Sequence, residues 1–160
     1  MQRDTHPSPQ EIEVIAAANS LQKVQERTLL AQPESDYMND SQLAFFRQRL
    51  LDEREELTAH LREVKASIAS HERDSDEADQ ASFEEELRLA LRQADRESRL
   101  ITNIDAALKR IESGDYGYCE ETGEPIGIPR LLFRPTAKLC IEAKERQEQK
   151  EHHYRKARGE

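Results

Sequence analysis

A seven-residue repeat of apolar side chains runs through residues 41–68, SQLAFFRQRLLDEREELTAHLREVKASI. Its members are Leu43, Leu50, Leu57 and Val64. Further apolar residues fall between them, so that one side of an α-helix carries a continuous stripe, as in the seam of a coiled coil. The stretch therefore predicts a long helix, which one of the residues 39–41, Asn-Asp-Ser, can cap.

A second stripe, with steps of four and three, follows in residues 83–111, apart from one missed position at Glu97. Its members are Phe83, Leu87, Ala90, Ala94, Ile101, Ile104, Leu108 and Ile111. Two such helices predict an antiparallel hairpin, each arm of which has ~30 residues and is about 45 Å long.

Facing residues of an antiparallel hairpin have numbers that add to a nearly constant sum. A sum of 151 matches Leu43 with Leu108, Leu50 with Ile101, Leu57 with Ala94 and Val64 with Leu87. This register places the turn in residues 73–76. It also brings Glu53 opposite Glu97, in a polar layer that Arg54, Arg96 or water would relieve.

The fold class expected is mostly α, with a long antiparallel coiled coil on a small globular region and a C-terminal helix. Residues 1–35 form an N-terminal arm that is partly helical, and residues 36–113 form the coiled coil, with an acidic tip near 73–79. Residues 114–136, rich in Gly, Pro and Tyr, are predicted to form short hairpin-like pieces and turns. Residues 137–160 form a last helix and a charged tail.

The composition excludes several classes of protein. Of the 160 residues, 36% are charged, the net charge is -9 and there is no Trp. Even with its five glycines the apolar fraction is about 39%, below the ~45–50% of an ordinary globular domain. No apolar run approaches the ~18 residues of a membrane span, and the acidic N-terminus does not suit a signal peptide. We expect a cytoplasmic protein that does not bind DNA directly.

The predicted tip concentrates negative charge. Residues 71–86, HERDSDEADQASFEEE, hold eight acids and one arginine. Helix capping and the helix dipole account for two or three acids. An acidic probe, which reaches into a basic cavity or toward a metal ion, would account for all eight. Both interpretations stay open on the residues alone.

The two cysteines have half of a zinc-binding pattern. Cys119 and Cys140 stand where two C-x-x-C pairs would begin, but Thr122 and Ala143 occupy the second positions. Two thiolates do not close a tetrahedral structural site. Two buried thiols that act as small apolar groups are the alternative to a zinc site.

A basic cluster follows the first cysteine and consists of Arg130, Arg134, Lys138, Lys144, Arg146 and Lys150. A solvated helix face explains most of it, although a phosphate-bearing ligand near Arg134 would also fit. The common catalytic motifs of hydrolases, nucleotide-binding proteins and metalloproteases are absent, so we expect no enzyme.

Three groups of residues resemble the DksA/TraR family of bacterial transcription factors. They are Tyr37-Met38-Asn39 with Gln42-Leu43-Ala44-x-Phe46-Arg47; Asp95-Arg96-Glu97 with Leu100-Ile101; and the run Gly117-Tyr118-Cys119-Glu120, Gly123-Glu124-x-Ile126-Gly127-Ile128-x-Arg130-Leu131, Arg134-Pro135-Thr136-Ala137-x-Leu139-Cys140-Ile141. The resemblance covers about residues 36–150 and is most specific in the last run.

The resemblance implies a zinc-ribbon-like domain, a C-terminal helix and a coiled coil that enters the secondary channel of RNA polymerase. Such factors act with guanosine tetraphosphate (ppGpp) in the stringent response and change the stability of promoter complexes. Asp76, Asp79 and Ala81 match the family's tip motif. The resemblance further implies a monomer that binds polymerase, not DNA or a membrane.

Matches and departures together define the expected sites. Positions at the polymerase and ppGpp interface are Arg96, Leu100, Asn103, Arg134 and Lys144, of which Asn103 replaces a family lysine. Thr122 and Ala143 replace two zinc ligands, as in cysteine-poor paralogues that do not need zinc. Packing would then hold the small domain, through Tyr116, Tyr118, Ile126, Ile128, Leu131, Leu132, Phe133, Leu139 and Ile141.

Two alternatives stay open on the sequence. One is a Gre-type transcript-cleavage factor, whose coiled coil uses the same channel and whose tip acids hold Mg²⁺. The other is an adaptor protein whose coiled coil binds another helix. We expect no stably bound cofactor in the factor itself, with ppGpp at its interface with polymerase.

Overall fold

The computed structural model describes residues 21–74 and 80–157, without the side chains of residues 71–74, 80–82 and 157. The elements are a helix over residues 21–30, the short 3-10 helix η1 (Glu34–Asp36), α2 (Asp40–Asp74), α3 (Gln80–Ser113), α4 (Ile128–Phe133) and α5 (Ile141–Ala157). The expected mostly helical architecture is confirmed. Within the described residues, no helix combines the length and apolarity needed to cross a membrane.

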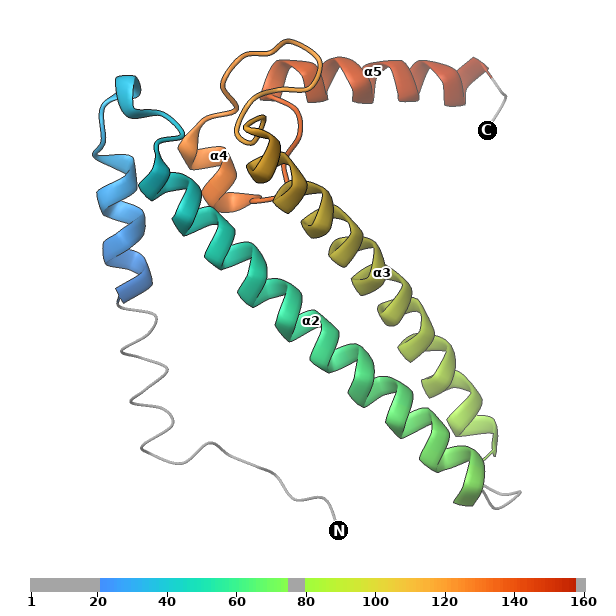
Figure 1. Ribbon diagram of the computed structural model, residues 1–160. Coiled ribbons are helices and arrows are strands. Elements are labelled where there is room, and N and C mark those ends of the chain that lie inside the picture. The colour runs from blue at the N-terminus through green and yellow to red at the C-terminus, as the bar shows by residue number, and fades with distance from the viewer. Residues whose placement is uncertain (1–20, 75–79, 158–160) are drawn as a thin grey trace.

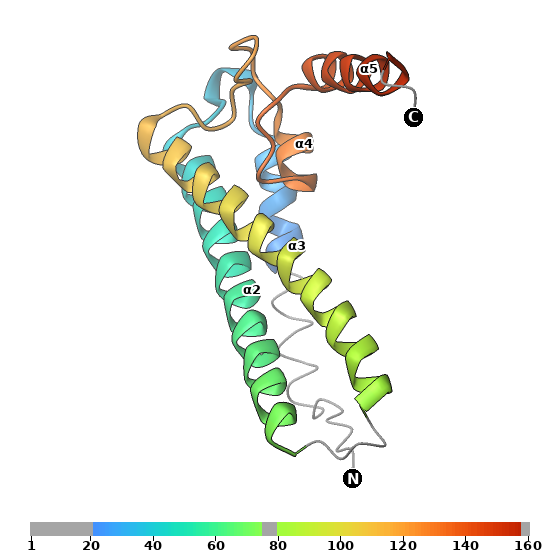
Figure 2. The same ribbon diagram turned by 90° about the vertical axis from the view of Figure 1, so that its right-hand side faces the viewer.

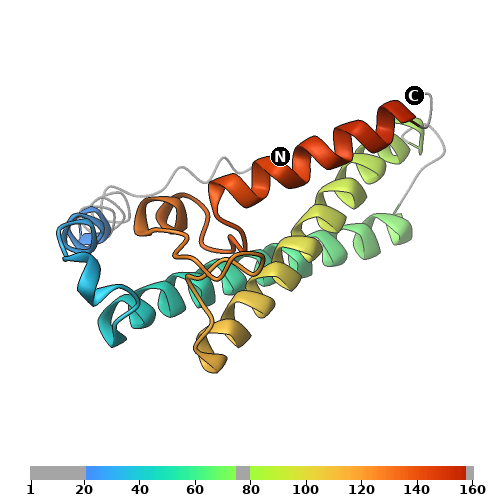
Figure 3. The ribbon, with the colours of Figure 1, turned by 90° about the horizontal axis from the view of Figure 1, so that it is seen from above.

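The two long helices α2 and α3 lie side by side as a hairpin, and the other elements gather at one end of it, the base (Figures 1 and 2). The helix over residues 21–30 and α5 lie on opposite sides of the base (Figure 3), and α5 projects away from the hairpin. The hairpin therefore stands free of the base over most of its length.

The start of α2 is fixed by two polar side chains. Asn39 Oδ1 accepts a hydrogen bond from the backbone N–H of Gln42 at 2.9 Å, and Gln42 Oε1 accepts one from the N–H of Met38 at 2.7 Å. This reciprocal arrangement resembles a capping box. Gln42 is almost fully buried and also donates to Gln32 Oε1, so it joins the preceding segment to the hairpin.

The hairpin register differs from the predicted one by about three residues, since the fully buried Leu50 and Ile104, and the helix ends Asp74 and Gln80, have numbers that add to 154. Arg54 Nε donates to Asp105 Oδ1 at 2.7 Å, and His60 Nδ1 lies 2.7 Å from Glu97 Oε2. The numbers of these pairs add to 159 and 157, because their long side chains reach diagonally across the seam. The prediction failed because each stripe has apolar members at steps of three and four, so a shift of three residues also brings apolar positions together.

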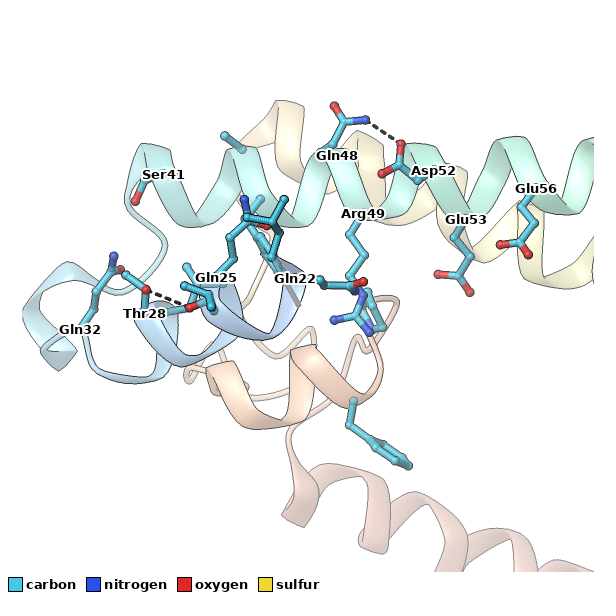
Figure 4. A pocket seen from close by; sticks show the side chains of 17 residues that line it. Gln22, Gln25, Thr28, Gln32, Ser41, Gln48, Arg49, Asp52, Glu53 and Glu56 are labelled. Carbon is cyan, nitrogen blue, oxygen red and sulfur yellow. Dashed lines mark hydrogen bonds between the residues drawn. The ribbon is translucent and has the colours of Figure 1, made fainter. Parts of the chain in front are cut away.

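Glu53 does not meet Glu97. Its side chain lies in a groove with Arg49 and Glu56 (Figure 4), while Glu97 receives hydrogen bonds from His60 across the seam and from Gln93 on its own helix. The polar layer expected at Glu97 is therefore present, but its partner is a histidine.

This polar layer predicts a pH dependence of stability. Hydrogen bonding and charge attraction from Glu97, with a smaller contribution from Glu63, raise the pKa of His60 against the opposing effect of burial. Hydrogen bonds from His60 and Gln93 lower the pKa of Glu97, burial opposes this, and Arg96 adds a small decrease.

The histidine contribution is complete below its ordinary pKa of 6.5 and is lost as pH rises through the raised value. The carboxylate contribution is complete above its ordinary pKa of 4.5 and is lost as pH falls through the lowered value. Urea unfolding should therefore show a stability difference between wild type and His60→Gln that is larger at pH 5.5 than at pH 8.5. An equal difference at both values would contradict the charge assignment.

The main hydrophobic core lies at the base. Phe46 and Leu50 from α2 pack with Ile104 from α3 and with Tyr116, whose ring centroid is 5.6 Å from that of Phe46. Of the residues predicted to hold the small domain, Tyr116, Ile126, Ile128 and Leu131 are buried, and Tyr118, Leu132 and Leu139 are partly buried. The prediction that Phe133 and Ile141 help to hold the small domain was wrong. Their side chains are 91% and 54% exposed, because each lies at the end of a helix beyond the core.

The small region is more helical than predicted. The hairpin-like element is one bridge between Tyr118 and Pro125, and α4 follows, with Pro in its first turn. The last helix begins at Ile141, four residues later than predicted, since residues 137–140 complete a turn and the Cys140 carbonyl accepts the N–H of Lys144. Gly114, with a φ of +84°, follows the last residue of α3 as expected.

A shallow groove lies between the residue 21–30 helix, α2 and the end of α4 (Figure 4). The short helix is attached by buried Leu29 and by an ion pair of 3.4 Å between Glu26 and Arg49. Leu21, Val24 and Phe133 are exposed apolar members of the groove.

Tyr37 links the start of the hairpin to the small region. Its hydroxyl donates to the carbonyl of Gly117 at 2.6 Å and accepts from the N–H of Gly127 at 2.9 Å. Met38 packs so closely on Gly117 that an added Cβ would lie 2.7 Å from its side chain. Gly117 also has a φ of +88°, so this contact requires glycine.

Replacing Tyr37 with phenylalanine should destabilise the protein by about 1–3 kcal/mol, since the Gly127 N–H loses its partner and the Gly117 carbonyl keeps only its bond from the Ile126 N–H. Tyr154→Phe is the matched control, because Tyr154 is 73% exposed. Thermal or urea unfolding of both variants measures the effect. Equal stability of Tyr37→Phe and the control would contradict a stabilising role of the hydroxyl.

Candidate functional site

The two cysteines come together in the small region. Both are buried, free thiols, and Thr122 Oγ1 lies 3.8 Å from Cys140 Sγ. The Thr122 hydroxyl and the backbone N–H groups of residues 121, 122 and 140 also lie near the Cys119 sulfur. Thr122 thus lies near both sulfurs.

These donors influence the pKa of Cys119. Burial raises the pKa of its thiol, but the Thr122 hydroxyl and three backbone N–H groups stabilise the thiolate and lower the pKa to about 6. These donors thus favour the thiolate form of Cys119.

Three of the predicted interface residues follow one another along α3. Arg96, Leu100 and Asn103 have steps of four and three, so they share one side of the helix, and all three are exposed. Leu100 is 37% exposed although it is a large apolar residue. Arg96 donates to Gln93, on its own helix.

Arg134 and Lys144 lie in the small region. Arg134 is the exposed residue that ends α4, and Lys144 lies in the first turn of α5, with Nζ 3.7 Å from Glu148 Oε1. Two other members of the basic cluster have structural partners: Arg130 donates to the carbonyl of Leu139, and Arg146 pairs with Glu121 at 3.1 Å. The cluster is therefore not one uniform anion-binding surface.

The predicted tip residues Asp76 and Asp79 lie outside the described residues. Ala81 belongs to the first turn of α3, but its side chain is not described. Between them, α2 and α3 bring the two ends of this acidic segment to the end of the hairpin that is far from the base (Figure 1).

Sequence reasoning missed several polar side chains that support the site. Arg110 donates to the carbonyls of Asp115 and Tyr118 and lies near Glu120, so it holds the loop before Cys119 onto the end of α3. The Tyr116 hydroxyl donates to the carbonyl of Pro135 at 2.8 Å. Long-range hydrogen bonds of this kind leave no periodic signal in a sequence.

Comparison with known proteins agrees with this architecture. The profile described as DnaK suppressor protein DksA, N-terminal domain, matches residues 42–111, and that of the prokaryotic dksA/traR C4-type zinc finger matches residues 114–149. The RNA polymerase-binding transcription factor DksA of Caulobacter vibrioides is 48% identical over 123 residues, which are 76% of this chain and 87% of that protein. This chain belongs to the DksA family.

Other DksA proteins give the same result. The RNA polymerase-binding transcription factor DksA of Escherichia coli strain K12 is 43% identical over 119 residues, which cover 70% of this chain and 75% of the relative. The solved structure of transcription factor DksA2 from Pseudomonas aeruginosa has a TM-score of 0.74 and 55% identity, and covers 80% of this chain and 99% of that one. As a DksA-family transcription factor, the protein is not an enzyme.

The C4-type zinc finger of the DksA family needs four cysteines, and the residues here do not fit it. Ala143 is fully buried and has no ligating atom, and the Thr122 hydroxyl is not an ordinary zinc ligand. Within the described residues, no three His, Cys, Asp or Glu side chains converge in a way that could hold a metal ion.

Proposed function

We propose that this DksA-family protein binds RNA polymerase directly, places its hairpin in the secondary channel and, together with ppGpp, changes the stability of promoter complexes. It acts in the cytoplasm as a monomer, in the stringent response. The observation that carries the proposal is the coincidence of the family match with a free-standing hairpin. Relatives named RNA polymerase-binding transcription factors align over most of their length.

The dimensions of the hairpin suit this role. The 35 residues of α2 correspond to about 52 Å, enough to carry the acidic residues 71–86 far from the base. In the proposal the base docks on polymerase, while Asp76, Asp79 and Ala81 act near the active site. The exposed row of Arg96, Leu100 and Asn103 contributes to the polymerase and ppGpp interface with Arg134 and Lys144.

We further propose that the protein works without zinc. Two features support this: Thr and Ala stand at positions 122 and 143, and Tyr37, Arg110 and the ring of Tyr116 tie the small region to the hairpin. Buried side chains from α2 and α3 continue into this region as one core. The small domain is thus packed on the hairpin and does not depend on its own core alone.

The decisive experiment is transcription in vitro from a ribosomal RNA promoter, with and without ppGpp, together with co-purification of the protein with RNA polymerase. After exhaustive chelation the protein should still bind polymerase and inhibit transcription, and ppGpp should increase the inhibition. Loss of folding on chelation, with stoichiometric zinc in the purified protein, would refute zinc independence. Cleavage of RNA in backtracked complexes would instead indicate a Gre-type factor.

A further inference from the structure

The middle of the hairpin seam contains one carboxylate. Glu97 is only 5% exposed, although it lies on the stripe that otherwise holds apolar residues. Its Oε2 lies 2.7 Å from His60 Nδ1, on α2, and its Oε1 accepts from Gln93 Nε2 at 2.7 Å. Because a carboxylate only accepts, His60 Nδ1 carries the proton. Both oxygens of this buried group are therefore satisfied.

A buried polar pair is a costly way to fill a seam, because apolar side chains there are usually as stable or more so. Such a pair can instead select one register of α2 against α3, as a polar residue at a core position of a coiled coil selects one register. The hairpin faces such a choice, since its apolar stripes also match after a slip of one heptad.

The residues one heptad from His60 show which alignments are disfavoured. Glu53 stands seven positions before it and Ser67 seven positions after it. A slip in one direction would replace the histidine opposite Glu97 with a carboxylate, and a slip in the other direction would replace it with a short hydroxyl. Only the observed register gives Glu97 a donor at this place that can also carry positive charge.

The other ion pair across the seam has a weaker effect on the register of the hairpin. Arg54 and Asp105 are joined at 2.7 Å, but their side chains are 46% and 43% exposed. Exposed ion pairs contribute little and are screened by salt. The discrimination between registers therefore rests mainly on the polar layer of His60, Gln93 and Glu97.

We propose that Glu97 and His60 are positioning residues, which hold α2 and α3 in one register and so set where the tip stands relative to the base. Glu97 is buried in the seam, about 25 Å along α3 from Gln80, so it acts on the tip through the register and not by contacting polymerase. A slip of one heptad displaces one helix along the other by about 10 Å. The consequence for transcription rests on the proposed function, but the register itself does not.

The register can be measured in the free protein as the distance between spin labels. Labels on unnatural keto amino acids at positions 62 and 92, both exposed on the two arms, avoid the native thiols. The wild type should give one narrow distance distribution by pulsed electron resonance. Glu97→Leu should give a second or a broadened population and a higher melting temperature, because leucine fits either register. Glu97→Gln, which retains an acceptor for His60, should keep the narrow distribution.

A second variant exchanges the two residues that compete for Glu97. Glu53→His combined with His60→Glu keeps the composition and moves the histidine seven positions along α2, so the distance distribution should shift toward the slipped register. Glu112→Leu, an exposed position near the end of α3, controls for added apolarity. The wild-type distribution in Glu97→Leu, or in the exchange variant if Glu97→Leu does not fold, would overturn the proposal.

Transcription assays separate this proposal from the proposed function. Glu97→Leu should bind polymerase with wild-type affinity but inhibit a responsive promoter several-fold less, despite its higher melting temperature, and Glu97→Gln should restore inhibition. If the Glu97→Leu protein shows two registers and still inhibits transcription as the wild type does, the positioning role is overturned. A wild type that does not inhibit would refute the proposed function and leave the distance test of the register intact.

Discussion

Replacing Asp79 with asparagine is expected to remove most of the inhibition of a responsive promoter, while the melting temperature and the affinity for polymerase stay close to those of the wild type. The substitution keeps the shape of the side chain and removes one charge from a segment that holds eight acids and one arginine. A charged hydrogen bond contributes about 1.5–3 kcal/mol, so its loss near the active site would weaken inhibition on the order of tenfold or more.

Stability should not change, for a local reason. Asp79 directly precedes the first residue of α3, and asparagine caps a helix as well as aspartate does. Affinity should not change because, in the proposed function, the base makes most of the contact with polymerase. Asp52→Asn makes the same chemical change at an exposed position near the base and is the matched control. Equal losses of affinity and of inhibition in Asp79→Asn would contradict this division of roles.

The hairpin could be predicted from sequence because its signal is periodic and local. Apolar residues every three or four positions imply two helices, and the confirmed architecture follows from that pattern. The register could not be predicted in the same way, because apolar members at steps of three and four also match after a shift of three residues or of one heptad. The side chain opposite Glu97 is the main feature that distinguishes the alignments, and a histidine and a glutamate one heptad apart both appear as gaps in a hydrophobic stripe.

The small region was less predictable because long-range contacts define it. The spacing of Cys119 and Cys140 indicated a degenerate zinc site, and the structure buries both cysteines in the small region, with Thr122 beside Cys140. The α4 helix has six residues and begins beside a glycine and a proline, so its sequence pattern is that of a turn. The hydroxyl of Tyr37 bonds to residues 80 and 90 positions away, and no local pattern announces such a partner.

Restoring two cysteines should convert the small region into a zinc site. The sulfurs of a tetrahedral site with Zn–S bonds of about 2.3 Å lie about 3.8 Å apart. Thr122 Oγ1 already lies 3.8 Å from Cys140 Sγ, so Thr122→Cys places a third sulfur at a suitable distance. Ala143 follows Cys140 by three residues at the start of α5, and such residues share one side of a helix. Ala143→Cys can then supply the fourth sulfur.

The Thr122→Cys, Ala143→Cys variant should bind one zinc ion per chain, as measured by metal analysis, whereas the wild type should bind none tightly. Without metal the variant should be less stable than the wild type, because a sulfur added at fully buried Ala143 overpacks the core, at about 1–3 kcal/mol. Zinc-finger peptides gain ~10–16 kcal/mol on binding zinc, so even a net gain of about 3 kcal/mol would raise the melting temperature by roughly 6–12 °C. A chelator should reverse this gain in the variant and leave the wild type unchanged.

The Thr122→Ser, Ala143→Ser variant, with no new ligands, should not respond to zinc. Stoichiometric zinc in the wild type, or none in the four-cysteine variant, would contradict the geometry inferred for this site.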